Sequence, residues 1–569
     1  MRSSFAFHLR LAHCRATVLI VFLSAIFWPP AGFAADSQAN RAAVGTHGMV
    51  VSESDDAAHA GIEILKQGGN AVDAAVATAL AVGVTNPASC GIGGGGFMLI
   101  YIAKNHGFYA LDYRETAPLM ARPDMYIRNG KPDPELSKDG ILAVAVPGEI
   151  AGIDAALRRF GTMKFQQIAA PAEKLAENGF AVNPHLAGEI AHMLPKLNAD
   201  PGMREVFVKS DGAPAKAGET IYAKKLAATL KRLGDDPVAN FYHGEVAAQI
   251  VSFMKEHGGL ITANDLTNYR PIWRSPIRRQ YRGYDVVAMP PPSSGGVVLE
   301  MLGMLEGGRL AGLGVDSPPY LARLIEVMRQ GFIDRAQYAD PAFVGVEIGK
   351  LLSDRHIGEL RDRALHRKAP PPDTPAAHDH GTTNLLVADK DGNVVALTTT
   401  TNTVFGALIS VPALGLLLND EMDDFAIAPG VPNAYHLAGE RANEIRPGKR
   451  PLSSMTPIIV TKNNVPVMST GGSGGPTIIS GVLQVTLNVL DFHLDAAHAV
   501  DEPRIHEQAV PDVVIVEESM PAATRVALEE MGYKIKVAPS LGAVGALTIE
   551  PGNYRGAFDQ RKGGGAVGY

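Results

Sequence analysis

The chain has 569 residues, of which 46% are hydrophobic and 20% are charged. This composition is typical of a large globular protein with an extensive core, and it excludes a peptide ligand or a small module. The formal net charge of −7 argues against nucleic-acid binding. The 60 glycines and 39 prolines indicate many tight turns, so we expect functional residues in glycine-lined loops.

The first 34 residues have the pattern of a secretory signal peptide. Three arginines precede twelve largely apolar residues, 17–28, and Gly32 and Ala34 are the small residues of a cleavage site. The apolar run is shorter than the ~20 residues that span a bilayer, which disfavours an uncleaved anchor. We expect cleavage after Ala34 and a mature protein, without a membrane anchor, in the periplasm or outside the cell.

The mature chain keeps one cysteine, Cys90, because Cys14 lies in the signal. A single cysteine forms no internal disulfide. Two interpretations stay open for it: a small buried hydrophobic residue, which is favoured, and a thiol nucleophile. No His, Cys or carboxylate set has the spacing of a metal-ligand motif, so we expect neither a metal nor a cofactor.

Sequence periodicity predicts alternating helices and strands. Apolar residues at helical spacing follow Ser54, and a run of small residues, 71–83, follows Asn70; Ser and Asn both favour helix N-caps. The middle of the chain, residues 148–365, is expected to be mostly helical. Further expected elements are strands over 97–102, 108–113, 284–289 and 465–470, helices over 297–305 and 477–490, and a hairpin over 381–400.

A Pro-rich polar segment, residues 368–380, stands directly before Gly381 and Thr382. Such a segment does not pack, so it is a linker or a chain end. A threonine that becomes a chain N-terminus can use its own α-amine, with a pKa near 8, as general base. The order of polar segment, threonine and strand fits that chemistry. The alternative is a Thr pair that begins a strand because of β propensity alone.

Two glycine-rich motifs each have two interpretations. Residues 91–96 contain G-x-G-x-x-G, but a helix precedes and a strand follows, which favours a tight structural loop over nucleotide binding. Residues 471–475 match the nucleophile elbow G-x-S-x-G around Ser473. Because the acid and histidine partners that follow crowd into about sixteen residues, we favour an oxyanion hole formed by glycine N–H groups.

Eight ordered runs resemble the γ-glutamyltransferase (glutathione hydrolase) family of N-terminal-nucleophile hydrolases. They are residues 69–75, 86–97, 112–118, 144–148, 289–296, 419–425, 450–455 and 474–475. The resemblance implies an α+β fold, a four-layer αββα sandwich. It also implies a precursor that cuts itself between Gly381 and Thr382. With the signal 1–34 removed, a large subunit of residues 35–381 pairs with a small catalytic subunit of residues 382–569.

The resemblance also assigns roles to individual residues. Thr382 is the nucleophile, Thr400 orients it, and the N–H groups of Gly474 and Gly475 stabilise the oxyanion. Guanidinium and hydroxyl groups suit the α-carboxylate of a γ-glutamyl group, whereas acids suit its α-ammonium. The implied set is Arg114, Ser453 and Ser454 for the carboxylate, Asn402, Glu421 and Asp424 for the ammonium, and Tyr435 as an aromatic lid.

The implied activity transfers a γ-glutamyl group from glutathione and related amides, through an ester on Thr382, to water or to an amino acid or peptide amine. Two alternatives stay open. A glutaryl-cephalosporin acylase is disfavoured because Asp424 would be buried without a counter-charge. An unprocessed protein that binds γ-glutamyl peptides is raised by Asn384, which stands where many family members carry His.

Overall fold

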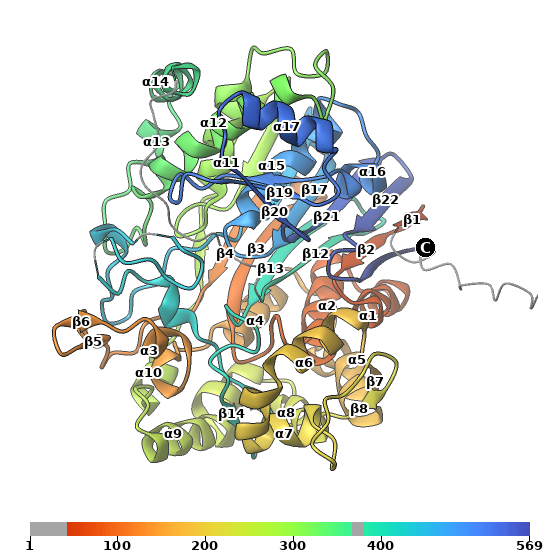
Figure 1. Cartoon of the computed structure of the whole chain (residues 1–569). Coiled ribbons are helices and arrows are strands. Elements are labelled where there is room, and N and C mark those ends of the chain that lie inside the picture. The colour runs from red at the N-terminus through yellow and green to blue at the C-terminus, as the bar shows by residue number, and fades with distance from the viewer. Residues whose placement is uncertain (1–41, 367–380, 429, 438) are drawn as a thin grey trace, which may run out of the picture. The chain divides into compact units, whose positions relative to one another are not determined.

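The structure is a computed structural model that describes residues 42–366 and 381–569, apart from 429 and 438. The expected signal peptide and the Pro-rich segment 368–380 lie outside the described residues. The chain divides into compact units of residues 1–37 and 38–569, and every described residue belongs to the second. This unit combines helices with two large β-sheets (Figure 1).

The first sheet carries the strand that follows Thr382, and we name it the β12 sheet. Its strand order is β23-β2-β12-β13-β3-β4-β9, and every neighbouring pair is antiparallel. The strands are β2 Met49–Ser52, β3 Gly95–Ile102, β4 Gly107–Tyr113, β9 Ile272–Arg274, β12 Thr383–Ala388, β13 Val394–Thr400 and β23 Gly565–Gly568. Strands β12 and β13 form the expected hairpin, in which Thr383 lies opposite Thr399.

The second sheet, the β17 sheet, has the order β1-β22-β21-β17-β16-β11-β10 and is also antiparallel throughout. Its strands are β1 Ala42–Gly45, β10 Ile277–Tyr281, β11 Tyr284–Ala288, β16 Ile458–Lys462, β17 Val465–Ser473, β21 Ala543–Glu550 and β22 Asn553–Phe558. A nucleophile elbow needs a parallel α/β-hydrolase sheet. Because β17 is antiparallel to both neighbours, the elbow interpretation of Ser473 is wrong.

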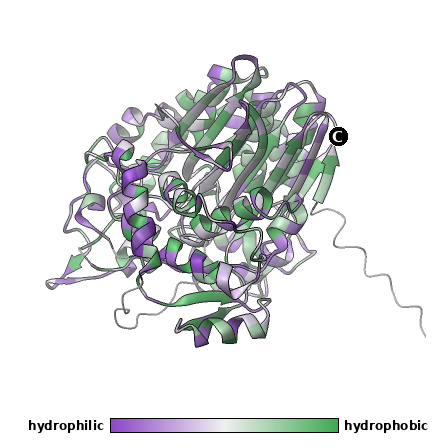
Figure 2. Cartoon of the chain, turned by 90° about the horizontal axis from the view of Figure 1, so that it is seen from above, coloured by the Kyte–Doolittle hydropathy of each residue, from purple (hydrophilic) through white to green (hydrophobic). Residues whose placement is uncertain are grey.

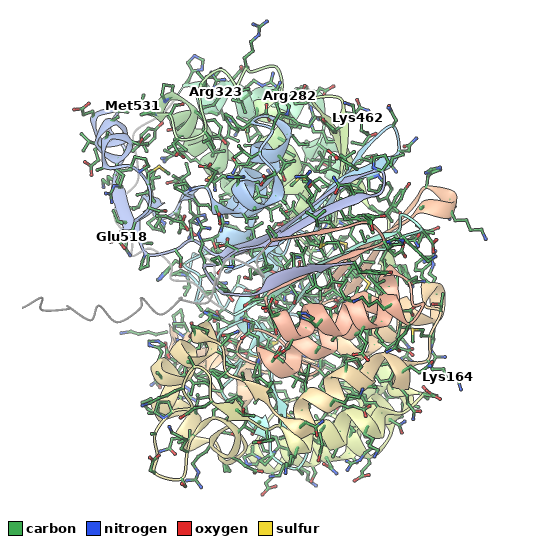
Figure 3. The ribbon with its side chains drawn as sticks, turned by 90° about the vertical axis from the view of Figure 1, so that its right-hand side faces the viewer. Lys164, Arg282, Arg323, Lys462, Glu518 and Met531 are labelled. Carbon is green, nitrogen blue, oxygen red and sulfur yellow. The ribbon has the colours of Figure 1, made fainter. Side chains whose placement is uncertain are left out.

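Helices pack against each sheet, and the two sheets contact each other through β12, β13 and β17 (Figure 1). Helices α1 and α2 contact the β12 sheet, whereas α11 and α15 contact the β17 sheet. Figure 3 shows Lys164, before α5, and Arg323, on α12, on opposite sides of the sheets. The helices of this framework are α1 Asp55–Lys66, α2 Ala71–Thr85, α4 Glu149–Phe160, α5 Phe165–Asn178, α6 Pro184–Ala199, α7 Pro201–Phe207, α8 Lys224–Leu233, α9 Glu245–His257, α11 Gly295–Leu305, α12 Pro318–Arg335, α14 Asp354–Leu365, α15 Thr477–Leu490, α16 Ala496–Asp501 and α17 Ala522–Glu530.

Short helices and small sheets complete this framework. The short helices are α3 Glu135–Lys138, α10 Ala263–Asn268 and α13 Ile348–Leu351. The small sheets are β5 Ile127–Arg128 with β6 Lys131–Pro132, β7 Phe180–Ala181 with β8 Thr220–Ile221, β14 Ser410–Val411 with β15 Leu416–Leu417, and β18 Ile505–His506 with β19 Val514–Glu517 and β20 Ile535–Ala538. Within the described residues, no helix is both long and apolar enough to cross a membrane.

Alternation along β12 sends its side chains into two separate cores. Leu385 and Val387 join the core shared with α1 and α2, whereas Leu386 and Ala388 join the core between the sheets. In Figure 2, much of the length of the strands in the two large sheets has the green colour of hydrophobic residues. Thr382 has the parity of Leu386, so the same alternation directs it toward the β17 sheet.

Several local expectations are confirmed. Ser54 caps α1 and Asn70 caps α2 through side-chain oxygens, and α2 extends two residues beyond the expected end at Gly83. Cys90 is buried and unpaired, and burial raises the pKa of its thiol well above the usual value. A buried thiol that resists ionisation is a poor nucleophile, so the small-hydrophobe interpretation is the one that fits.

Candidate active site

Two threonine hydroxyls lie beside the predicted cleavage bond. The Oγ atoms of Thr382 and Thr400 are 3.0 Å apart across β12 and β13. Thr382 Oγ donates to the carbonyl oxygen of Gly381, and Thr400 Oγ lies 3.3 Å from the same oxygen. The N–H of Asn402 donates to Thr400 Oγ at 2.7 Å, which fixes that hydroxyl. The hydroxyls of Thr382 and Thr400 therefore both contact the carbonyl of the bond expected to break.

Gly381 is tightly enclosed. A Cβ atom at this position would lie 2.7 Å from the carbonyl oxygens of both Ala88 and Thr403. Such distances are well inside normal van der Waals contact, so the chain accepts only glycine here without moving. The enclosure holds the carbonyl of Gly381 beside Thr382 Oγ.

Gly474 and Gly475 connect β17 to α15. In the described part of the chain, no acceptor takes the N–H of either glycine. Helix α15 begins at Thr477, so its positive end adds to these donors. Adjacent N–H groups without an acceptor have the chemistry of an oxyanion hole, and Gly475 lines the same pocket as Thr382.

One pocket brings together the residues that the resemblance assigned. Ten of them line it: Arg114, Thr382, Thr400, Asn402, Glu421, Asp424, Tyr435, Ser453, Ser454 and Gly475. Gly381 and Gly474 are not among the lining residues, whereas Met455 and Ile478, which the sequence did not single out, are. The pocket therefore collects residues spaced over more than 350 positions of the chain.

The charged groups of the pocket pair with one another. The two terminal nitrogens of buried Arg114 donate to Glu421 and Asp424, and Glu115 lies 3.6 Å away. Burial raises the pKa of Glu421 well above its usual range, although Arg114 opposes this, and raises the pKa of Glu115 to about 8. One cation and several acids thus share a buried site.

Arg335 is a further buried cation that the sequence did not reveal. It ends α12 and donates to Ser454 Oγ at 3.3 Å and to Ser294 Oγ at 3.0 Å. Burial lowers its pKa to about 10, although Asp424 opposes this. Its partner Ser294 lies in the run 289–296, one of the eight that resemble the family, so this part of the site had a sequence signal. No sequence pattern along α12 marked Arg335 itself.

Tyr435 closes the pocket from the loop that follows Asp424. Its hydroxyl donates to Asn402 Oδ1 at 2.7 Å, and its ring lies against Gly475. Only 3% of the residue is exposed. Its position against Gly475, in the pocket that Thr382 also lines, is compatible with the expected lid.

Asn384, the departure from the family pattern, lies away from the pocket. Its Nδ2 donates to the carbonyl oxygen of Leu397 at 2.9 Å, and its side chain packs against Gly471 of the facing sheet. It fills space between the sheets. Its contacts give no support to a role in binding γ-glutamyl peptides.

The family model for gamma-glutamyltranspeptidase matches residues 57–569. The chain belongs to the γ-glutamyltranspeptidase family. It is 39% identical to the glutathione hydrolase proenzyme of Escherichia coli K12 over 547 residues, covering 94% of this chain and 93% of the relative. It is 38% identical to the glutathione hydrolase proenzyme of Bacillus subtilis, covering 92% of each. The resemblance stated from the motifs is confirmed, and the chain is an enzyme of this family.

Solved structures agree with the assignment. The cephalosporin acylase from Bacillus halodurans superposes with a TM-score of 0.84 at 30% identity, covering 96% of this chain and 99% of that one. The γ-glutamyltranspeptidase of Helicobacter pylori gives a TM-score of 0.53 at 38% identity, covering 54% of this chain and 88% of that one.

Proposed function

We propose that this enzyme is a self-processing γ-glutamyltransferase and glutathione hydrolase whose nucleophile is Thr382. The observation that carries the proposal is the pocket beside Thr382. It combines a hydroxyl, N–H donors and charges of both signs. A γ-glutamyl group, which bears an α-carboxylate and an α-ammonium next to its amide, matches all three.

Maturation begins when Thr382 Oγ attacks the carbonyl carbon of Gly381. The C–N bond breaks, the acyl group moves to Oγ, and the amide nitrogen becomes a free amine. Water then hydrolyses the ester, which leaves a carboxylate on Gly381 and a free N-terminal Thr382. The contact of both threonine hydroxyls with the Gly381 carbonyl oxygen supports this step.

The two products would remain one folded body after removal of signal 1–34. The β12 sheet pairs β2 of the large subunit, 35–381, with β12 of the small subunit, 382–569, and the β17 sheet pairs β11 with β16 in the same way. We infer that the subunits share one four-layer αββα sandwich of the N-terminal-nucleophile type, and that the mature protein lies in the periplasm or outside the cell.

In the catalytic cycle the α-amine of Thr382 takes the proton of Oγ as it attacks the γ-glutamyl amide. The N–H groups of Gly474 and Gly475 receive the developing oxyanion; one such donor is worth about 3–4 kcal/mol in other acyl-transfer enzymes. The amine leaves with the proton. Water or a second amine then attacks the ester on Thr382, which gives hydrolysis or transpeptidation.

Substrate binding replaces internal ion pairs with ion pairs to the ligand. The α-carboxylate takes the guanidinium of Arg114 with Ser453 and Ser454, and the α-ammonium takes Glu421 and Asp424 with help from Asn402. Because the ligand is a zwitterion, every buried charge keeps a partner, which a buried charge requires. Tyr435 then covers the site.

A denaturing gel with N-terminal sequencing tests the proposal. Wild-type protein should give two bands, the smaller beginning at Thr382, and Thr382→Ala should give one uncut chain. Thr383→Ala is the matched control, since Thr383 Oγ has no hydrogen-bond partner among the described residues. A wild-type chain that stays uncut, as an inactive binding protein would, or cleavage in Thr382→Ala, would contradict it.

A second candidate, a glutaryl-cephalosporin acylase, is raised by the fold shared with the cephalosporin acylase from Bacillus halodurans, which is 30% identical. Asp424 separates the two because a glutaryl group has no α-ammonium. Asp424→Asn should lower turnover of a γ-glutamyl anilide by roughly 10- to 100-fold, the effect of losing a charged hydrogen bond, and spare a glutaryl anilide. Equal losses on both anilides would refute the assignment of Asp424 to the α-ammonium.

A further inference from the structure

Three side chains on different helices converge at a place outside the pocket of Thr382. They are Glu300 on α11, Asp334 on α12 and His356 on α14, and one ligand atom from each lies within 4.8 Å of the others. The residues are separated by 34 and 22 positions, so no motif spacing marks them in the sequence. The packing of the three helices creates the cluster.

Glu300 brings an unsatisfied carboxylate oxygen to this place. The residue is completely buried, and the hydroxyl of Tyr338 donates to its Oε1 at 2.8 Å. Its Oε2 has no hydrogen-bond partner among the described residues. A buried polar atom without a partner is uncommon and calls for a missing ligand or proton.

The other two side chains complete a ligand set. His356 Nε2 and Asp334 Oδ2 are 2.6 Å apart, and Gln337 donates to the other oxygen of Asp334. Two carboxylates and an imidazole therefore meet beside the hydroxyl of Tyr338 and the side-chain amide of Gln337.

We propose that Glu300, Asp334 and His356 bind a divalent transition-metal ion, for which Zn²⁺ is the natural probe. Tetrahedral zinc takes three protein ligands at about 2.0–2.2 Å and one water, which places ligand atoms roughly 3.4 Å apart. Since Nε2 of His356 and Oδ2 of Asp334 are 2.6 Å apart and the three ligand atoms lie within 4.8 Å of one another, side-chain rotations have to bring them to that spacing. The ion would replace the proton that these two atoms share, which passes to solvent, and would give Glu300 Oε2 a partner.

The outer contacts and the access fit a metal centre. Tyr338 and Gln337 hold the remaining carboxylate oxygens, as second-sphere groups do in metal sites. The side chain of His356 is 14% exposed, so an ion and its water can enter from solvent on that side. The ion would link α14, the last described helix before Gly381, to α11 and α12.

Calorimetry and metal analysis of the full protein, stripped with EDTA and dialysed, test the proposal with ZnCl₂ as the probe. We expect one Zn²⁺ per chain, a thermal midpoint that rises by several degrees, and weaker binding of Mg²⁺, which prefers oxygen ligands. Glu300→Gln and His356→Asn should each weaken Zn²⁺ binding at least 30-fold. His356→Asn changes a partly exposed residue, so it remains informative if the Glu300 variant folds poorly.

The control is His498→Asn. His498 also forms a contact with an acid, Asp495, at 2.9 Å, but it lies on the surface. This variant should keep wild-type zinc affinity. Absence of saturable zinc binding by wild-type protein, or binding that survives both substitutions in the cluster, would overturn the proposal and leave a hydrogen-bonded network.

Discussion

At the scale of single residues, the guanidinium of Arg335 is held by hydrogen bonds to two hydroxyl groups. Its guanidinium donates to Ser294 and Ser454, and Ser454 also lines the pocket of Thr382. A lysine ammonium cannot reproduce this planar fork. We expect Arg335→Lys to raise the KM for a γ-glutamyl donor about tenfold, as loss of one charged hydrogen bond does, and to change kcat less than threefold.

Arg329→Lys is the matched control for this prediction. Arg329 lies six residues earlier on α12 and pairs with Asp512 at 2.5 Å, away from the pocket. Steady-state kinetics of both variants measure the effect. A similar rise in KM for both would mean that α12 is merely disturbed, and an unchanged KM in Arg335→Lys would refute its positioning of Ser454.

The candidate residues that the sequence could predict are those in ordered motifs. Arg114 and Asp424 stand in quoted runs, and the structure brings both into one pocket. Their pairing with each other was not predictable, because motif chemistry assigns each to a ligand group and says nothing of the charges between them. Arg335 and Glu300 were missed because their contacts join segments that lie far apart in the sequence, which no local pattern records.

At the scale of elements, the contact between β3 and β13 controls the position of Thr400. Gly94 directly precedes β3, and a Cβ atom there would lie 1.9 Å from the carbonyl oxygen of Thr400. We expect Gly94→Ala to push the strands apart, lower the free energy of unfolding by roughly 1–3 kcal/mol or more, and slow self-cleavage. Thermal unfolding and the rate of band conversion on a gel measure both effects.

Gly188→Ala provides the comparison, because Gly188 lies exposed in α6 with open space around its Cβ position. There alanine should stabilise the helix by roughly 0.5–1 kcal/mol. The same substitution would thus act in opposite directions at the two sites. A stable, normally processed Gly94→Ala variant would show that β3 and β13 can separate without moving Thr400.

Elements with a local sequence signal were predictable, whereas the strands with which they pair were not. Caps at Ser54 and Asn70, and the hairpin at Asp391 and Gly392, follow from short-range chemistry. The pairing of β17 with β21 joins strands some 75 residues apart, and no local pattern encodes it. For this reason the sequence alone could not exclude a nucleophile elbow at Ser473, whereas the antiparallel pairing of β17 does exclude it.

At the scale of the whole molecule, the proposed cleavage at Gly381 would divide the chain without dividing its hydrophobic cores. Each large sheet contains strands from both sides of Gly381, so both hydrophobic cores contain residues of both subunits. Separating the subunits would expose these cores to water, which the hydrophobic effect opposes strongly. A stable heterodimer therefore follows from the strand order once the bond is cut.

Global stability should also depend on pH through Glu149. This residue begins α4, is buried, and accepts a hydrogen bond from Thr399 Oγ at 2.6 Å. Burial raises its pKa from 4.5 to about 7. The folded chain therefore keeps a proton that the unfolded chain releases between these values, so the contribution of Glu149 to stability falls as pH rises from about 4.5 to 7.

Glu149→Gln keeps the side chain neutral at every pH and removes this loss. In the uncut Thr382→Ala background, urea unfolding should show the Gln variant more stable than its parent at pH 8, by roughly 3 kcal/mol for a shift of this size. The difference should vanish near pH 4, where both side chains are neutral. Glu63→Gln, at an exposed position on α1, should give no such trend. A stability difference that stays constant between pH 4 and pH 8 would mean that Glu149 is ionised in the folded protein, with Thr399 and its surroundings compensating the buried charge.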